Sequence, residues 1–146
     1  MDTCFSEIRK ALDEYGIKPT HGHSLDEIAD FFARINSYDR YINIDFNDYI
    51  AIIRSASTIC IATETVSYDN IGKALSSMLA TTVDGRKPSS VLVNFNIGPD
   101  FMMEHMNLVS EAFAPLSSDA EIIWGMSHSN SPVHEVEVAA VLGFKQ

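Results

Sequence analysis

Hydrophobic side chains recur at helical spacing in the first third of the chain. This pattern predicts a helix over residues 3–15, a second helix that starts at Ser24 and a third over about 46–55. Glu27 stands three residues after Ser24, which is the spacing of a capping box at a helix start. Two or three helices are therefore expected before the first long strand.

From residue 57 onward, runs rich in β-branched residues alternate with helical patterns. The predicted elements are strands at 57–66, 89–97, 119–129 and 135–144 and helices at 67–83 and 101–116. The strand-helix-strand order implies parallel strands with right-handed crossovers, which place both helices on one face. The last strand is expected to hairpin back on the third. The predicted fold class is α/β (α+β), a four-stranded mixed sheet packed by two helices on one face and preceded by the N-terminal helices.

Composition and charge narrow the class of partner. With 146 residues, 46% of them hydrophobic and 21% charged, the chain is long enough for a single domain with its own core. A net charge of -10 argues against nucleic acid and anionic membranes, which bind clustered Lys and Arg. No apolar stretch approaches the ~20 residues that cross a bilayer, and no signal peptide is expected. Cys4 and Cys60 are expected to be reduced, which indicates a cytoplasmic protein.

One short segment, "NIDFNDY" at 43–49, concentrates polar residues between apolar runs. Asp45 is a good N-cap and Asp48 follows three residues later, so both carboxylates can stabilise the start of the next helix. Two neighbouring carboxylates next to Asn43 can also position water or a metal ion for phosphoryl transfer. From the residues alone, both interpretations stay open.

Three longer motifs, in this order, resemble the C-terminal (activation) domain of the FtsZ/tubulin superfamily of filament-forming GTPases, on the FtsZ side. They are "YINIDFNDY", similar to the family's synergy loop, "SSVLVNFNIGPDFMMEHMNLVSEAF", similar to a strand-loop-helix, and "AEIIWGMSHSNSPVHEVEVAAVLGF", similar to the last two strands. The resemblance covers about 24–144 and divides a single domain, 1–146, into three parts. These are an extra N-terminal helix at 1–20, a helix, synergy-type loop and helix at 24–55, and an α/β sandwich at 56–146.

The resemblance implies that the loop acts on the nucleotide of a neighbouring subunit. Asn43 would contact that nucleotide or orient water, and Asp45 and Asp48 would activate the water, with Phe46 and Tyr49 supporting the loop. The family's Gly-rich phosphate loop has no counterpart, because the seven glycines of this chain are not clustered. We therefore expect no nucleotide site, cofactor or metal in this chain and no enzyme activity of its own.

The leading hypothesis is a nucleotide-free FtsZ-like domain that works by protein-protein contact. It would modulate or cap assembly of an FtsZ/tubulin-type GTPase through the synergy-type loop. The alternative is a stand-alone binding or scaffold domain, possibly a homodimer, in which the aspartates are only helix caps. An enzyme that uses a pocket of its own is the third hypothesis.

The histidines give a weaker signal. His21 and His23 lack a nearby framework of cysteines or carboxylates, so a solvated loop is expected rather than a metal site. His128 and His134 flank the last predicted turn and are interpreted as surface residues.

Two further groups are interpreted as structural. Met102, Met103 and Met106 are expected to pack in and around the core rather than to form a binding patch. Gly98 is expected to make a tight turn, and Asp100 to cap the following helix or complement its dipole.

Overall fold

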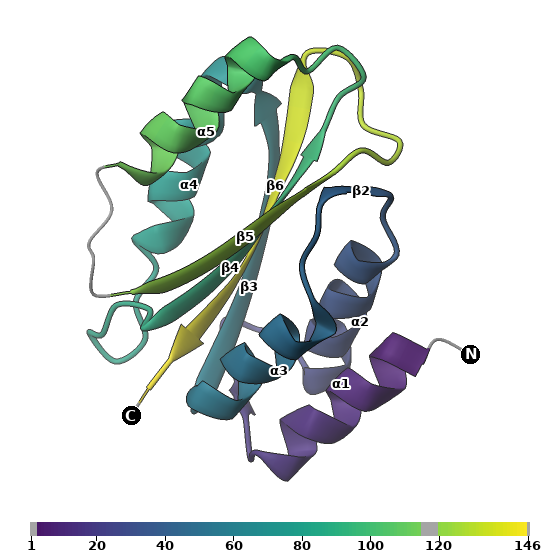
Figure 1. The fold of residues 1–146 in the computed structure, drawn as a ribbon. Coiled ribbons are helices and arrows are strands. Elements are labelled where there is room, and N and C mark those ends of the chain that lie inside the picture. The colour runs from purple at the N-terminus through teal and green to yellow at the C-terminus, as the bar shows by residue number, and fades with distance from the viewer. Residues whose placement is uncertain (1–2, 115–119, 146) are drawn as a thin grey trace.

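The computed structural model describes residues 3–114 and 120–145, which form a sheet with helices on both faces (Figure 1). The α-helices are α1 (Thr3–Glu14), α2 (Leu25–Asn36), α3 (Phe46–Ser55), α4 (Ile71–Leu79) and α5 (Met106–Phe113). Two 3-10 turns, η1 (Tyr68–Asn70) and η2 (Met103–His105), directly precede α4 and α5. No helix in the described ranges is both long and apolar enough to span a membrane.

Six strands form one mixed sheet in the order β1-β3-β6-β4-β5-β2. They are β1 (Lys18–Pro19), β2 (Arg40–Ile42), β3 (Thr58–Ser67), β4 (Ser90–Ile97), β5 (Glu121–Ser127) and β6 (Glu135–Phe144). β4 and β5 are parallel neighbours, whereas β6 runs antiparallel to both β3 and β4. The predicted mixed α/β class is confirmed.

The sheet differs from the prediction in its two edges. β1 and β2 extend the four predicted strands to six, and both lie between the predicted helices, where no strand was expected. Strands of two and three residues are too short to carry a periodic pattern, so the sequence offers no signal for them.

The last strand, β6, also takes a different place from the one predicted. It does not pair with β5 as a hairpin but lies between β3 and β4. Nearly all of β6 is buried, because helices cover both faces of the sheet at this strand. A strand that is apolar on both faces belongs in the centre of a sheet rather than at its edge.

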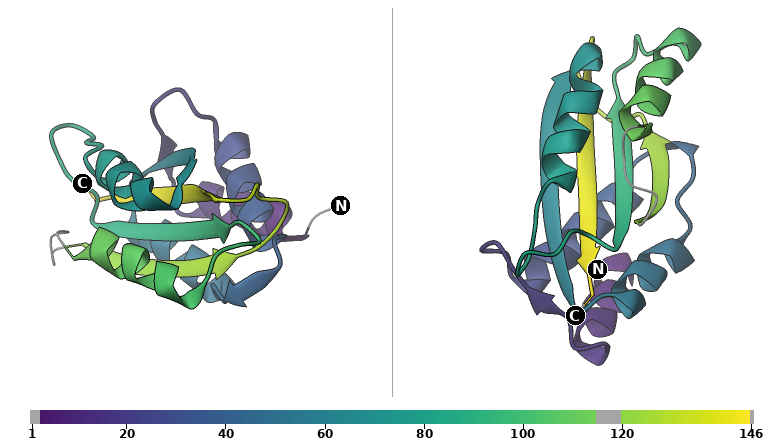
Figure 2. Two further views of the ribbon diagram at one scale, coloured as in Figure 1. Left: turned by 90° about the horizontal axis from the view of Figure 1, so that it is seen from above. Right: turned by 90° about the vertical axis from the view of Figure 1, so that its left-hand side faces the viewer.

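Helices lie on both faces of the sheet (Figure 2), and a hydrophobic core fills the space between the sheet and the helices on each face. α4 and α5 pack together on one face, as predicted, over alternate β6 residues such as Val138 and Leu142. α1, α2 and α3 pack on the other face, over Ala139 and Val141. The helices at the beginning of the chain are thus part of the main core rather than an appendage.

The predicted helix limits shift inward. The helix expected at 67–83 begins as η1 and ends at Leu79, and the one expected at 101–116 becomes η2 followed by α5. Residues 115–119, where the latter helix and the next strand were expected to end and begin, lie outside the described residues.

Candidate protein-protein interface

The segment 43–48 connects β2 to the first turn of α3. Asn43 and Asp45 are exposed, Asp48 is partly exposed, and Ile44 between them is buried. The three predicted polar residues are thus brought together on the surface while the segment itself is anchored through an apolar side chain.

Both aspartates hydrogen-bond to the backbone at the start of α3. The Asn47 N–H donates to Oδ1 of Asp45 at 3.1 Å, and the Asp45 N–H donates to Oδ2 of Asp48 at 3.1 Å. This is a reciprocal capping box, so the helix-cap interpretation is confirmed as geometry. Because both side chains still contact solvent, the cap does not hide the carboxylates.

Aromatic side chains in the first turn of α3 anchor the segment to the core. Tyr49 is only 1% exposed and packs edge-to-face against Phe32, with ring centroids 5.2 Å apart, and against Phe46, at 6.0 Å. Burial raises the pKa of Tyr49 to about 12. Tyr49 therefore supports the segment from within the core, and Phe46 does so from a partly exposed position.

Arg40 fixes the path into the segment, and the sequence patterns did not single it out. Its guanidinium donates to the backbone oxygens of Ile35 and Ile42, each at 3.2 Å, and so joins the end of α2 to β2. Gly125 of β5 leaves room for this arrangement, because a Cβ there would lie 2.7 Å from Nη2 of Arg40 and would contact Ile44. The only signal in the sequence was a lone basic residue next to the apolar pair Tyr41-Ile42.

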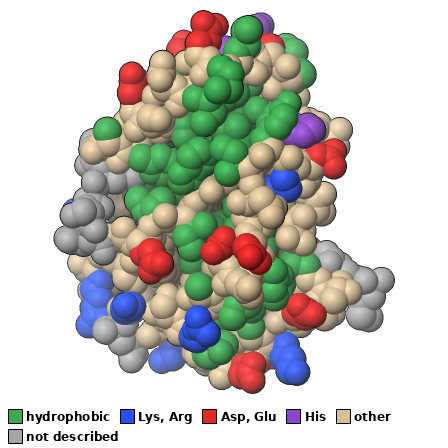
Figure 3. Space-filling model, viewed as in Figure 1, with side chains coloured by type: hydrophobic (Ala, Val, Ile, Leu, Met, Phe, Trp, Pro, Cys, Tyr) green, Lys and Arg blue, Asp and Glu red, His purple; other side chains and the backbone are tan. Residues whose placement is uncertain are grey.

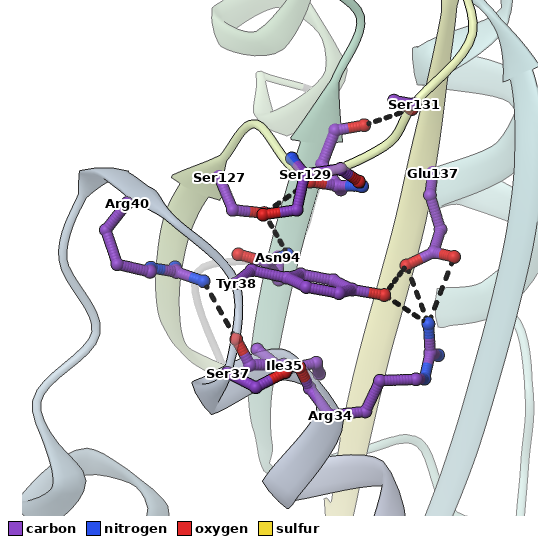
Figure 4. A network of polar contacts seen from close by, with 11 residues as sticks. Arg34, Ile35, Ser37, Tyr38, Arg40, Asn94, Ser127, Ser129, Ser131 and Glu137 are labelled. Carbon is purple, nitrogen blue, oxygen red and sulfur yellow. Dashed lines mark hydrogen bonds and ion pairs between the residues drawn. The ribbon is translucent and has the colours of Figure 1, made fainter.

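A polar network on the same face of the sheet holds the end of α2 (Figure 4). Arg34 donates from Nη1 to both carboxylate oxygens of Glu137, at 3.0 and 3.1 Å, and the Tyr38 hydroxyl donates to the same carboxylate at 3.2 Å. Burial and the Glu137 charge raise the pKa of Tyr38. These contacts fix where α2 ends and hence where β2 begins.

Two buried asparagines extend the network into the sheet (Figure 4). Asn94 donates from Nδ2 to the Ser127 hydroxyl at 3.0 Å, and that hydroxyl donates to Oδ1 of Asn96 at 2.8 Å. The Asn96 side chain in turn donates from Nδ2 to the backbone oxygen of Ser129. A hollow of about 340 Å³ next to these residues is lined mostly by polar residues. The signal in the sequence was the two asparagines inside the apolar strand at 89–97, to which no role was assigned from the sequence.

A broad apolar surface lies over β5 and α5 (Figure 3). On the α4–α5 side of the sheet, β2, β5 and α5 carry five apolar side chains that are only partly buried, and we call them the β5–α5 surface: Ile42, Met106, Phe113, Ile122 and Trp124. Figure 3 shows acidic side chains next to this area, in the region where α3 begins in Figure 1. The apolar surface and the 43–48 segment therefore lie on one side of the molecule.

The methionines just before and at the start of α5 differ most clearly from the sequence-based interpretation. Met102 is 61% exposed and Met103 is 85% exposed, so the expectation that the methionines pack in and around the core is wrong for these two. Only Met106 is partly buried against the core. The 3-10 turn η2 changes the helical phase before α5, and this phase cannot be seen in the spacing of the residues.

The histidines occupy structural positions. His23 lies 3.5 Å from Glu27, His128 stacks on Tyr41 with centroids 4.2 Å apart, and His134 contacts Asp100. His128 and His134 are exposed, as predicted. Within 3–114 and 120–145, no group of three or more potential ligands among His, Cys, Asp and Glu is placed to hold a metal ion.

Known proteins are similar to this chain in structure, whereas comparison by sequence finds no match. No protein-family profile matches the chain, and no curated protein matches it. An FtsZ dimer from M. jannaschii superposes with a TM-score of 0.58 and 21% identity, covering 92% of this chain and 43% of that chain. A mutant FtsZ from M. jannaschii gives a TM-score of 0.57 at 21% identity, covering 84% of this chain and 37% of the other.

A more distant similarity points to the same fold. A protofilament of TubZ from Bacillus thuringiensis serovar israelensis gives a TM-score of 0.52 at 8% identity, covering 97% of this chain and 40% of that chain. The chain thus has an FtsZ-like fold, as its motifs predicted, and spans roughly two fifths of the length of the chains it matches, which is consistent with the predicted C-terminal region.

Proposed function

We propose that this FtsZ-like domain works by protein-protein contact and docks the 43–48 segment together with the β5–α5 surface on an FtsZ- or tubulin-type GTPase. The observation that carries the proposal is the apolar surface beside the acidic segment (Figure 3). Monomeric proteins rarely expose large contiguous apolar areas, and aromatic and Met side chains are enriched in interfaces. Trp124 and Phe113, whose ring centroids lie 5.9 Å apart, are expected to contribute most to binding of the partner.

In this proposal the acidic segment acts inside the partner's nucleotide site. Asn43 orients the attacking water or contacts the nucleotide, and Asp45 and Asp48 polarise the water. Phosphoryl transfer depends mainly on positioning and electrostatics, so residues supplied from a second chain can accelerate it. The exposure of Asn43 and Asp45 supports this role.

Assembly of the partner is the process that such contact would alter. The matched structures include an FtsZ dimer and a TubZ protofilament, so chains with this fold associate with one another. A domain that offers one side of a head-to-tail contact ends a filament instead of extending it. We therefore expect shorter polymers and a changed GTPase rate.

The test adds the 146-residue chain to an FtsZ-type GTPase from the same cell and follows phosphate release and light scattering. Asp45→Asn is the informative variant, because asparagine retains N-cap strength while it removes the charge. We expect it to lose the effect on hydrolysis and keep the effect on polymer length. Asp84→Asn, in the α4–β4 turn, is the matched control. No change in rate or scattering at excess chain would refute the proposal.

The capping box favours a second candidate, a homodimeric scaffold in which the aspartates serve only α3. Light scattering after size-exclusion chromatography separates the two. A dimer whose formation shifts the emission of Trp124, the single tryptophan, supports the scaffold. A monomer whose Trp124 emission shifts only with the GTPase supports the docking proposal.

A further inference from the structure

Among the residues that the structure describes, the outer edge of β3 is unpaired over most of its length. β1 pairs with β3 only through Lys18 with Thr58 and Pro19 with Ile59, and no other strand of the described chain borders this side of β3. The right-hand view of Figure 2 shows the bare edge beside α4. From Cys60 to Ser67 this edge is roughly 26 Å long at about 3.3 Å per residue.

Backbone groups point outward along this edge in a regular row. The Lys18 N–H donates to the Ser57 oxygen at 3.0 Å, so the Ser57 carbonyl faces β1. Backbone direction repeats every second residue in a strand, so Ile61, Thr63 and Thr65 direct their N–H and C=O groups to the same side. A row of this kind is a template for an added strand.

A groove follows the same edge on the α4 side of the sheet. Glu64 and Val66 of β3 and Lys73, Ala74 and Ser77 of α4 are among the residues that line a hollow of about 280 Å³. Ala74 is buried and Val66 partly buried, which makes the floor apolar, whereas Glu64 and Lys73 are exposed. In the described part of the chain, Glu64 forms no ion pair.

We propose that the free edge of β3 and the adjoining groove bind an extended peptide of a partner as an added strand. Alternate side chains of the peptide enter the groove, with a basic side chain beside Glu64 and a β-branched apolar side chain beside Val66. Strand addition of this type takes affinity from the backbone and specificity from alternate side chains.

The charge of the chain selects the occupant. A net charge of -10 and Glu64, which has no ion-pair partner among the described residues, favour a basic peptide over a second copy of this chain, whose own β3 edge carries the same acid. The site lies at the edge of the sheet opposite β5 and β2, so it is separate from the surface used in the proposed docking on a GTPase.

The probe is a nine-residue peptide of alternating threonine and valine with a central lysine. Hydrogen exchange measured by NMR reports the edge amides of Ile61, Thr63 and Thr65. We expect their exchange to slow about tenfold at a peptide concentration ten times the Kd. The control peptide carries N-methyl groups on the alternate amides that face β3, and it should give no protection.

Charge reversal tests the groove independently of the backbone. Glu64→Lys changes an exposed side chain and should weaken binding of the lysine peptide up to about fivefold, and a central glutamate in the peptide should restore it. Glu104→Lys, at an exposed position on η2, should leave binding unchanged. Equal binding of the N-methylated peptide, or protection of the edge amides that rises with protein concentration without peptide, would overturn the proposal.

Discussion

Asp45 and Asp48 combine two demands at single positions. Each carboxylate accepts a hydrogen bond from a backbone N–H at the start of α3, yet neither is buried. Removal of either side chain therefore changes the stability of the fold and the charge of the surface at once. Any experiment on the segment has to separate these two effects.

Substitution of Asp45 makes the separation possible. Asp45→Ala should lower the free energy of unfolding by about 1 kcal/mol, because the Asn47 N–H loses its acceptor. Asp45→Asn should stay close to the wild type, since asparagine caps helices about as well as aspartate. Urea denaturation measures both, and equal losses in the two variants would show that the charge rather than the cap matters.

At the level of the elements, hydrogen bonds to Asp100 hold together loops that are distant in the sequence. On the far side of the sheet, Asp100 follows β4 and accepts hydrogen bonds from the Tyr68 hydroxyl at 2.6 Å and from the His134 N–H at 2.8 Å. Asp100 thus joins η1 and the β5–β6 loop. The sequence had suggested instead that Asp100 caps the following helix, α5. α5 begins only after η2, too far along the chain for Asp100 to serve as its cap.

This arrangement predicts a dependence on pH. The His134 N–H and the Tyr68 hydroxyl lower the pKa of Asp100 from 3.8 to about 2. A carboxyl with a lower pKa in the folded state stabilises the fold above its unfolded pKa, and this contribution is lost as the pH falls from 3.8 to about 2. Urea titrations across this range should show the stability gap between wild type and Asp100→Asn narrowing as the pH falls. A constant gap would contradict the assignment.

Gly125 offers a test of how β5 carries the segment. Gly125→Ala would place a Cβ 2.9 Å from the Ile42 oxygen and 2.7 Å from Nη2 of Arg40. We expect a loss of about 1–3 kcal/mol in the free energy of unfolding and shifted NMR signals for 43–48. Gly72→Ala is the control, because its Cβ would meet only Ala112, at 3.8 Å, and alanine favours helix α4. Unchanged stability in Gly125→Ala would argue against the packing described.

For the whole molecule, the two cores depend on elements from both ends of the sequence. α1 lies outside the motifs that resemble the FtsZ family, yet Ile8 and Leu12 are fully buried with α2 and α3. The first helix is therefore expected to be required for folding of the entire chain.

Leu12→Ala tests this dependence. Removal of a fully buried leucine should cost about 2–5 kcal/mol and lower the Tm of a single cooperative transition. Lys10→Ala, on the exposed side of α1, should have little effect. If Leu12→Ala melted α1 alone and left the sheet intact, α1 would be an appendage.

The sequence predicted the elements better than it predicted their contacts. Long periodic segments predicted α1 to α5 and the four long strands, and the structure confirms the capping box at Ser24. The place of β6, by contrast, depends on helices packing on both of its faces, and the sequence did not show that α1 to α3 would cover the second face. Arg40 and Gly125 matter through contacts with residues distant in the sequence, and a pattern along the chain cannot contain them.

The central position of β6 has a consequence for the order in which the sheet assembles. β3 and β4 have no contact in the sheet until β6 arrives between them, and β6 is separated from β3 by the whole of α4, β4, α5 and β5. During folding, β3 and β4 therefore each keep an unpaired side until residues 135–144 take their place between them. Pairing between strands so distant in the sequence is slow, so the two parts of the sheet are expected to join late in folding, with the facing edges of β3 and β4 exposed until then.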